Sequence, residues 1–104
     1  MTLKEWKSRL QVGIQLRCSY RHYAPGANEV ITIRKTQTNA VAWDYAGGSG
    51  IIKLSPGQLA WMFFPKKTCI RFTDDGFELL KPDGALMSRY HWIEAGPATV
   101  NESA

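Results

Sequence analysis

The side chains of this chain that are best suited to metal binding or nucleophilic chemistry are two cysteines and two histidines. Cys18 and His22 are four residues apart, and in an extended strand this spacing separates their Cα atoms by about 13 Å. A structural zinc site needs four ligands around one ion, and no second close pair accompanies these two residues. Cys18 or Cys69 would meet His91 only through tertiary packing. We therefore predict neither a metal site nor a cofactor.

Two further patterns resemble functional sites but are typical of turns. Residues 47–53, GGSGIIK, resemble a phosphate-binding loop, yet Lys53 falls in a predicted strand and no helix follows the glycines. Asp74, Asp75 and Asp83 lie in Gly-containing segments of the kind that form β-turns. Because no cluster of polar residues converges as acid–base catalysis requires, we predict that the chain is not an enzyme.

Charge gives the first indication of a binding function. The chain has a net charge of +4, but residues 1–71 contain eleven Lys or Arg against three Asp or Glu. Residues 72–104 reverse this balance, with two basic and six acidic residues. A polarised basic surface of this kind is typical of proteins that bind polyanions or acidic proteins.

Positive charge and an aromatic ring occur together at the first predicted strand, residues 14–22. Alternation of apolar and polar residues places Arg17 and Arg21 on one exposed face of this strand. Tyr23 follows in the next loop, where its ring can stack on a base while the arginines contact phosphates. A solvated strand face would explain the same arginines without any ligand. The candidate nucleic-acid-binding residues are Arg17, Arg21, Tyr23, Arg34, Lys35, Lys53, Lys66 and Lys67.

Composition predicts one domain with a core of its own. The chain has 104 residues, 44% of them hydrophobic and 12% aromatic, which is ample for a single small core. Most of the four tryptophans are expected inside, and Tyr23, Phe64 and Tyr90 are the aromatic candidates for exposure. We expect residues 1–94 to form the domain and residues 95–104 to be a disordered tail.

The central segment, residues 29–64, is predicted to organise the fold. Residues 30–34 and 40–45 are rich in β-branched and aromatic residues and are expected to form a hairpin. Residues 47–50 would form the next turn, and residues 51–54 would return as a third strand.

Two short helices accompany these strands. Ser55 as N-cap, Gln58 three residues later and Pro65 as a stop predict a helix near 56–64. At the N-terminus, Thr2 and Glu5 form a second capping box. The helix that they begin is expected to cover the barrel with its apolar side, which comprises Leu3, Trp6 and Leu10.

After Pro65, residues 68–73, 77–81 and 85–93 are predicted strands separated by two tight turns. The spacing of turns along the chain is typical of a meander or small barrel. The chain is thus predicted to be mostly β, a small antiparallel barrel with a C-terminal β-hairpin extension.

The run from residue 13 to residue 65 resembles the SH3-like small barrels of short bacterial, phage and plasmid proteins. The resemblance is carried by YRHY, EVITI, AVAWDY, GIIKL and SPGQLAWMFFP, in that order. It implies a strongly bent five-stranded barrel, and such barrels often bind nucleic acid or peptides through their early strands. The hairpin over residues 77–93 departs from the minimal pattern.

Two functions follow from these observations. The first is a non-enzymatic module that binds RNA or DNA through a basic face. The alternative is a protein-binding inhibitor or adaptor, encoded by a phage or other mobile element, that acts on a host nuclease or defence complex. A homodimer formed through an exposed edge strand is compatible with either. We expect no membrane association, because the chain has no long apolar run and its start is too charged for a signal peptide, so a cytoplasmic location is predicted.

Overall fold

The computed structural model describes residues 1–49, 54–55 and 57–93 of the chain. Within these ranges the chain forms one α-helix, one short 3-10 helix and seven strands. In chain order they are α1 (Leu3–Arg9), β1 (Gln15–Arg21), β2 (Asn28–Thr36), β3 (Ala40–Ser49), β4 (Ala60–Phe63), η1 (Lys67–Cys69), β5 (Ile70–Phe72), β6 (Gly76–Leu80) and β7 (Leu86–Trp92).

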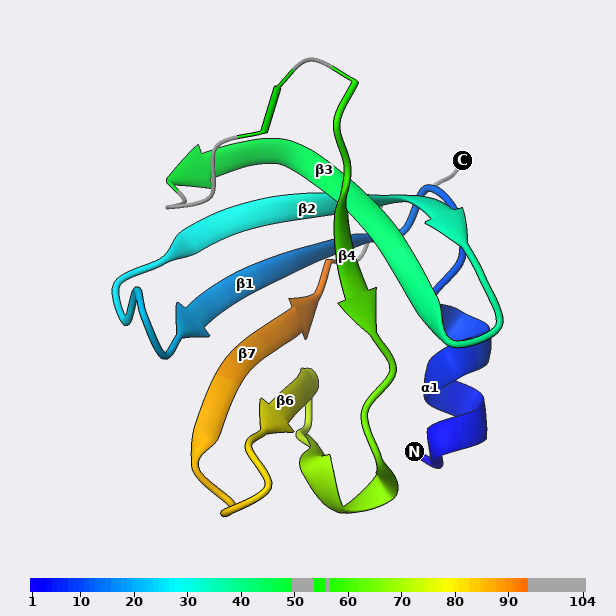
Figure 1. Ribbon diagram of the computed structural model, residues 1–104, viewed down its shortest axis with the longest axis vertical. Coiled ribbons are helices and arrows are strands. Elements are labelled where there is room, and N and C mark those ends of the chain that lie inside the picture. The colour runs from blue at the N-terminus through cyan, green and yellow to red at the C-terminus, as the bar shows by residue number, and fades with distance from the viewer. Residues whose placement is uncertain (50–53, 56, 94–104) are drawn as a thin grey trace.

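All seven strands belong to one antiparallel sheet with the order β4-β3-β2-β1-β7-β6-β5. The sheet curls into a half-barrel, and Figure 1 shows β4 in front of the curved strands β2 and β3. Residues of β4, β6 and β7 line one cavity, so the two halves of the sheet face each other across the interior. The predicted mostly-β barrel is confirmed. The C-terminal hairpin is more than an extension, because β7 pairs directly with β1.

The N-terminal helix covers one end of the half-barrel, as its sequence predicts. Thr2 accepts a hydrogen bond from the Glu5 backbone N–H at 3.1 Å, and the Glu5 carboxylate accepts one from the Thr2 N–H at 2.7 Å. Trp6 is fully buried, and its ring packs edge-on against Phe64 at 5.3 Å and Phe77 at 5.2 Å between centroids. The short helix is therefore held mainly by its buried tryptophan, because seven residues are too few for a stable isolated helix.

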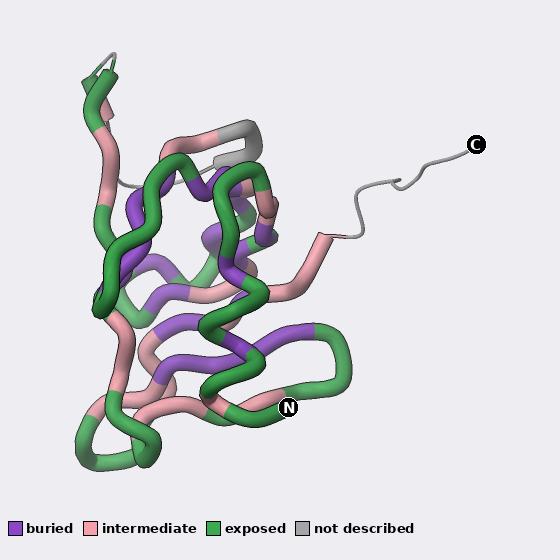
Figure 2. Tube along the Cα trace, turned by 90° about the vertical axis from the view of Figure 1, so that its right-hand side faces the viewer, coloured by how far each residue is buried: buried purple, intermediate pink, exposed green. Residues whose placement is uncertain are grey.

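The core lies on the concave face of the sheet. Alternate residues of each strand point inward, as the period of two requires. Figure 2 shows buried segments along the strands, whereas most of α1, apart from Trp6, and most turns are exposed. The buried cluster consists of Trp6, Leu10, Leu16, Cys18, Ile31, Ile33, Val41, Trp43, Met62, Phe77, Leu79 and Tyr90.

The predicted helix near 56–64 is wrong, because residues 60–63 form strand β4 and pair with β3. Gly57 has a φ of +80°, a left-handed conformation that interrupts a helix in its first turn. The predicted cap is partly formed, since Gln58 accepts a hydrogen bond from the Ser55 backbone N–H at 3.0 Å, but it closes a turn. A two-turn helix is marginal alone, whereas the edge of β3 offers four residue pairs.

The predicted turn over residues 47–50 is also wrong in its first three residues, which continue β3. Gly47 and Gly48 pair with Val30 and Glu29, because β2 extends back to Asn28 and offers them partners. The expected third strand, residues 51–54, lies outside the described residues except for Leu54, which is not in a strand. The predicted tail, residues 95–104, lies outside them as well.

The C-terminal half follows its prediction closely. Thr73 donates a backbone hydrogen bond to Gly76 at 3.0 Å across the first turn. Gly84 occupies the second turn with a φ of +90°. Cys18 and Cys69 are free thiols. Among the described residues, no helix has the length and hydropathy needed to cross a membrane.

Candidate nucleic-acid interface

Arg17 occupies the position that the sequence predicts for it, on the convex face of β1. Its side chain is exposed, and Nη1 donates a hydrogen bond to the Asn28 side-chain oxygen at 2.8 Å. The neighbouring strand places His91 beside it. Arg17 is therefore accessible to a ligand from solvent.

Arg21 is not on this face, contrary to the prediction, and is only 7% exposed. The pairing of β1 with β7 shifts register between Cys18 and Tyr20, so that Ser19 is an additional residue, a β-bulge. One extra residue reverses the alternation of side chains along the strand. The bulge thus turns Arg21 into the concave interior, where it cannot contact a phosphate backbone.

The Arg21 guanidinium is part of a buried polar cluster. Nε donates a hydrogen bond to Glu29 Oε1 at 2.7 Å, and Nη1 donates one to the Tyr90 hydroxyl at 3.3 Å. The guanidinium also lies 5.4 Å from the centroid of the Trp43 ring. Burial lowers the pKa of Arg21, but Tyr90, Cys18 and Glu29 together raise it above its ordinary value. Burial, with the Glu29 charge added, raises the pKa of Tyr45 to about 12.

The other predicted basic residues are exposed but dispersed. Arg34 forms an ion pair with Asp44 at 2.9 Å, whereas Lys35 next to it on β2 is exposed. Lys66, which precedes η1, and Lys67, the first residue of η1, are both exposed. Lys53 lies outside the described residues. The structure therefore gathers no single basic cluster from the predicted set.

The three aromatic residues predicted to be exposed differ in their actual exposure. Tyr23 is 48% exposed, and its ring packs edge-on against His22 at 5.0 Å. Phe64 is half-buried against Trp6, and Tyr90 is buried. Tyr23 is thus the one of the three that can stack on a ligand freely.

The sequence reasoning missed two exposed rings on β4. Trp61 is 41% exposed and Phe63 is 68% exposed. They pair with Ala42 and Ala40, so both rings lie on the convex face, opposite Met62. Reading residues 60–63 with a period of two would have put these rings on one face. The sequence predicted a helix here and most of the tryptophans in the core instead.

Trp61 and Phe63 lie on the same face as part of the positive charge. Ala42 pairs with Trp61 on one side and with Lys35 on the other. Paired residues in adjacent strands share a face, and two strand spacings separate Lys35 from Trp61 by about 10 Å. We name Trp61, Phe63 and Lys35 the β4 platform.

A cleft follows the concave side of β4. One cavity of about 350 Å³ is lined by all four β4 residues together with Trp43, Ser88 and Tyr90, and Arg21, His22 and Tyr23 close one end. A second cavity of about 430 Å³ extends from Phe63 to Lys66 and Pro82. Phe63, Leu79 and Met87 line both cavities, so the two cavities adjoin, and together we call them the cleft.

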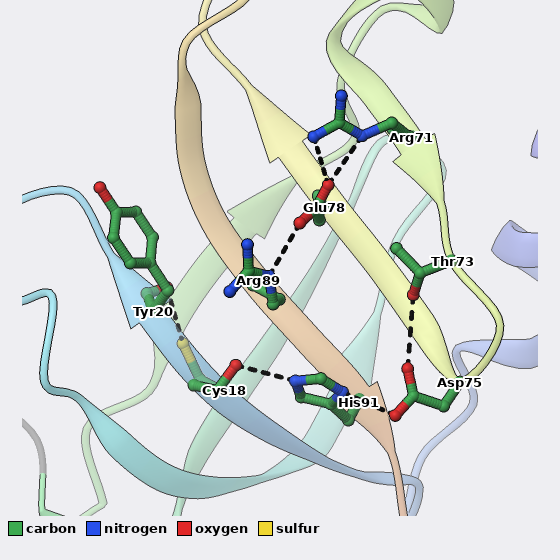
Figure 3. A network of polar contacts seen from close by, with 9 residues as sticks. Cys18, Tyr20, Arg71, Thr73, Asp75, Glu78, Arg89 and His91 are labelled. Atoms are coloured by element: carbon green, nitrogen blue, oxygen red, sulfur yellow. Dashed lines mark hydrogen bonds and ion pairs between the residues drawn. The ribbon is translucent and has the colours of Figure 1, made fainter.

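The other end of the convex face holds charges that are already paired (Figure 3). Glu78 accepts hydrogen bonds from Arg71 Nε at 2.7 Å and from Arg89 Nε at 2.8 Å. The hydrogen bond from Arg89 lowers the pKa of Glu78, burial opposes this, and Arg71 lowers the pKa further. We name Arg71, Glu78 and Arg89 the outer network. Here the acidic C-terminal part of the chain meets the basic part, and their charges offset one another.

A second row of contacts lies beside the outer network. His91 Nδ1 lies 3.0 Å from the Asp75 carboxylate, and His91 Nε2 lies 2.8 Å from the Ser19 hydroxyl. The hydrogen bond with His91 lowers the pKa of Asp75. The order Ser–His–Asp is that of serine hydrolases, in which the Asp is buried, whereas the Asp75 side chain is 70% exposed. These contacts tie the turn before β6 to β7 and β1.

The described residues contain no group of three or more His, Cys, Asp or Glu side chains that could hold a metal ion. No protein family, curated protein or solved structure has significant similarity to the chain. The functional conclusion therefore depends on the geometry of the chain itself.

Proposed function

We propose that the protein is a small binding module for single-stranded nucleic acid, and that the β4 platform is its contact surface. The observation that supports this most is the pair of exposed rings, Trp61 and Phe63, on the face that also carries Lys35. Proteins that hold single strands without sequence preference combine stacking rings with basic side chains in this way.

The spacing of the two rings suits bases. Residues two apart on one face of a strand have Cα atoms separated by about 6.8 Å. This is twice the 3.4 Å rise per nucleotide of a strand in duplex DNA, so one base fits between the two rings. Lys35 and the exposed Lys66 would then contact the phosphates on either side. Resemblance of residues 13–65 to SH3-like small barrels adds support at the level of fold only.

The test is fluorescence anisotropy with labelled dT12, U12 and a 12-base-pair duplex, measured between 20 mM and 200 mM salt. We expect binding to dT12 or U12 to weaken linearly on a plot of log affinity against log salt, because phosphate contacts release counterions. Trp61→Ala should weaken binding about tenfold, since stacking on one ring contributes about 1–3 kcal/mol. Lys35→Glu should lower the salt slope as well as the affinity.

The matched control is Val12→Ala, which shortens another exposed apolar side chain far from β4 in the sequence and should leave binding unchanged. Tyr23→Ala tests whether the stacking residue predicted from sequence contacts the ligand. We expect it to lower the affinity by less than Trp61→Ala does. No binding at 20 mM salt, or equal binding by wild type and Trp61→Ala, would contradict the proposal.

A further inference from the structure

The open edge of β4 carries a second feature, distinct from its rings. β4 is the terminal strand of the sheet, and its four residues, AWMF, include no Lys or Pro. Terminal strands in soluble proteins are commonly protected by charged residues, prolines or bulges, because their free backbone groups pair readily with another chain. Residues 60–63 have none of these protections within the strand.

The register of β4 identifies which backbone groups are free. Phe64 donates its N–H to the Asn39 carbonyl at 2.9 Å, and Met62 is the partner of Val41. Hydrogen-bonding direction alternates along an antiparallel strand. The N–H and C=O groups of Trp61 and Phe63 therefore point away from β3, toward the open edge.

These free groups adjoin the cleft. The cavity of about 350 Å³ is lined by residues of β4 on one side and by Ser88 and Tyr90 of β7 on the other. Together the two adjoining cavities of the cleft are lined by residues from Tyr23 through all of β4 to Pro82, and their walls are largely aromatic and aliphatic.

Charge distinguishes the ends of the cleft from its middle. Lys66 lies at one end, and Arg21 and His22 lie at the other. Because Arg21 is paired with Glu29, exposed Lys66 is the main positive charge that a ligand would meet. Among the described residues that line the two cavities, none is Asp or Glu.

We propose that the cleft binds an extended peptide segment of a partner protein, which adds to the free edge of β4 as an eighth strand and places an acidic side chain near Lys66. The ligand is a polypeptide because it must pair with the free N–H and C=O groups of β4. Only a peptide strand supplies alternating donors and acceptors at the spacing of Trp61 and Phe63. Apolar side chains of the segment would enter the cleft. This site uses the backbone edge of β4, whereas the proposed nucleic-acid contact uses the exposed rings of the same strand.

The test uses a random 12-residue peptide library displayed on phage and selected against the wild-type protein and against Phe63→Pro. Proline removes one free N–H of the edge but none that β3 uses, and prolines are tolerated on edge strands. Phe63→Ala is the matched control, because it removes the ring and keeps the N–H. We expect peptides with alternating apolar residues and a terminal Asp or Glu to be enriched on the wild type, less strongly on Phe63→Ala because Phe63 lines both cavities, and not at all on Phe63→Pro.

One enriched peptide, made synthetically, then gives a measurement that does not depend on the fold of any variant. Methylation of the peptide nitrogen that pairs with β4 removes one hydrogen bond and disturbs the strand pairing. It should therefore weaken the binding of the peptide to the wild type by about tenfold or more. Lys66→Glu should weaken it several-fold. Equal affinity of the methylated and unmethylated peptides would overturn the proposal.

Two further results would also overturn it. One is failure to enrich any peptide on the wild type over Phe63→Pro. The other is a wild-type dimer in analytical ultracentrifugation that Phe63→Pro converts to monomer, because a second copy of the chain would then occupy the edge. Failure of dT12 binding, by contrast, would leave the peptide result unaffected.

Discussion

Two arrangements of arginine and carboxylate lie on opposite faces of the same sheet. On the concave face, Arg21 and Glu29 form an ion pair with exposed side-chain fractions of 9% and 0%. On the convex face, Glu78 is shared by Arg71 and Arg89, whose side chains are 60% and 41% exposed. Both arrangements join adjacent strands, yet only in the convex one does water reach the arginines, while the Glu78 side chain itself is 7% exposed.

This difference decides what each arrangement does. A buried ion pair adds little net stability, but removing one partner leaves a charge without water, at a cost of about 3–5 kcal/mol. An exposed pair is worth about 0–1 kcal/mol. Arginines on the two faces are therefore not interchangeable as binding candidates, although their spacing in the sequence makes them look alike. The Arg21–Glu29 pair contributes to folding stability, whereas the two exposed convex arginines, Arg71 and Arg89, can be changed with little effect on it.

The largest expected effect separates two arginines of β1. Arg21→Glu would place a second carboxylate beside Glu29 inside the barrel, and we expect a loss of about 4 kcal/mol or more in the free energy of unfolding. Arg17→Glu, on the exposed face of the same strand, should change it by no more than about 0.5 kcal/mol. Urea denaturation monitored by tryptophan fluorescence measures both.

The double variant Arg21→Met/Glu29→Met serves as the control, because replacing a buried pair by apolar residues of similar size is often neutral. It should recover most of the stability lost in Arg21→Glu. If Arg21→Glu and Arg17→Glu were equally stable, the bulge at Ser19 and the burial of Arg21 would be incorrect.

The wrong prediction for Arg21 shows that local sequence does not specify a β-bulge. Alternation of apolar and polar residues predicts β1 and the direction of Arg17 correctly, because both depend only on the local period of two. The reversal after Ser19 comes from a bulge, which is set by how β1 and β7 pair across about seventy residues of sequence. No local pattern in residues 18–21, CSYR, indicates it. Capping boxes and hairpin turns, by contrast, depend on local sequence. The capping box at residues 2–5 and the turns at residues 36–39 and 82–84 were therefore predicted correctly.

The same distinction between local sequence signals and long-range strand pairing explains which residues of the candidate site were predicted. Residues 56–64 carry local signals for a helix, but pairing with β3 outweighs them and exposes Trp61 and Phe63 on a strand. Gly47 and Gly48, read as a turn, are likewise recruited into a strand by β2. The one basic residue of the platform, Lys35, was predicted from charge. Its rings were not, because their exposure depends on which neighbouring strand they join.

A second prediction concerns the hairpin that carries the outer network. An ideal Cβ at Gly76 would lie 1.9 Å from the Tyr90 carbonyl oxygen, a backbone atom that cannot move aside. Gly76→Ala should therefore force β6 away from β7. We expect it to lower the free energy of unfolding by about 3 kcal/mol, near the upper end of overpacking effects. Gly26→Ala is the matched control, since nothing lies within 4 Å of its Cβ position. Thermal unfolding followed by circular dichroism would show the difference, and equal midpoints for the two variants would contradict the close approach of β6 to β7.

The smallest effect is expected for the outer network itself and depends on pH. The pKa of Glu78 is lowered in the folded state, chiefly by the hydrogen bond from Arg89, so folding favours its ionised form. Its stabilising contribution is therefore complete above its ordinary pKa of about 4.5 and is lost as pH falls through the lower folded value. Glu78→Gln should cost about 1 kcal/mol at pH 7 and progressively less below pH 4.5.

Urea denaturation of wild type and Glu78→Gln between pH 7 and pH 3 tests this expectation. The remaining slope in the variant would come from other carboxyls with a lowered pKa, such as Asp75 and Glu5. A stability difference that stayed constant with pH would show that Arg71 and Arg89 do not hold Glu78 as an ionised partner. A difference of several kcal/mol would show that the outer network behaves like the buried pair of Arg21, and would remove the contrast between the two faces.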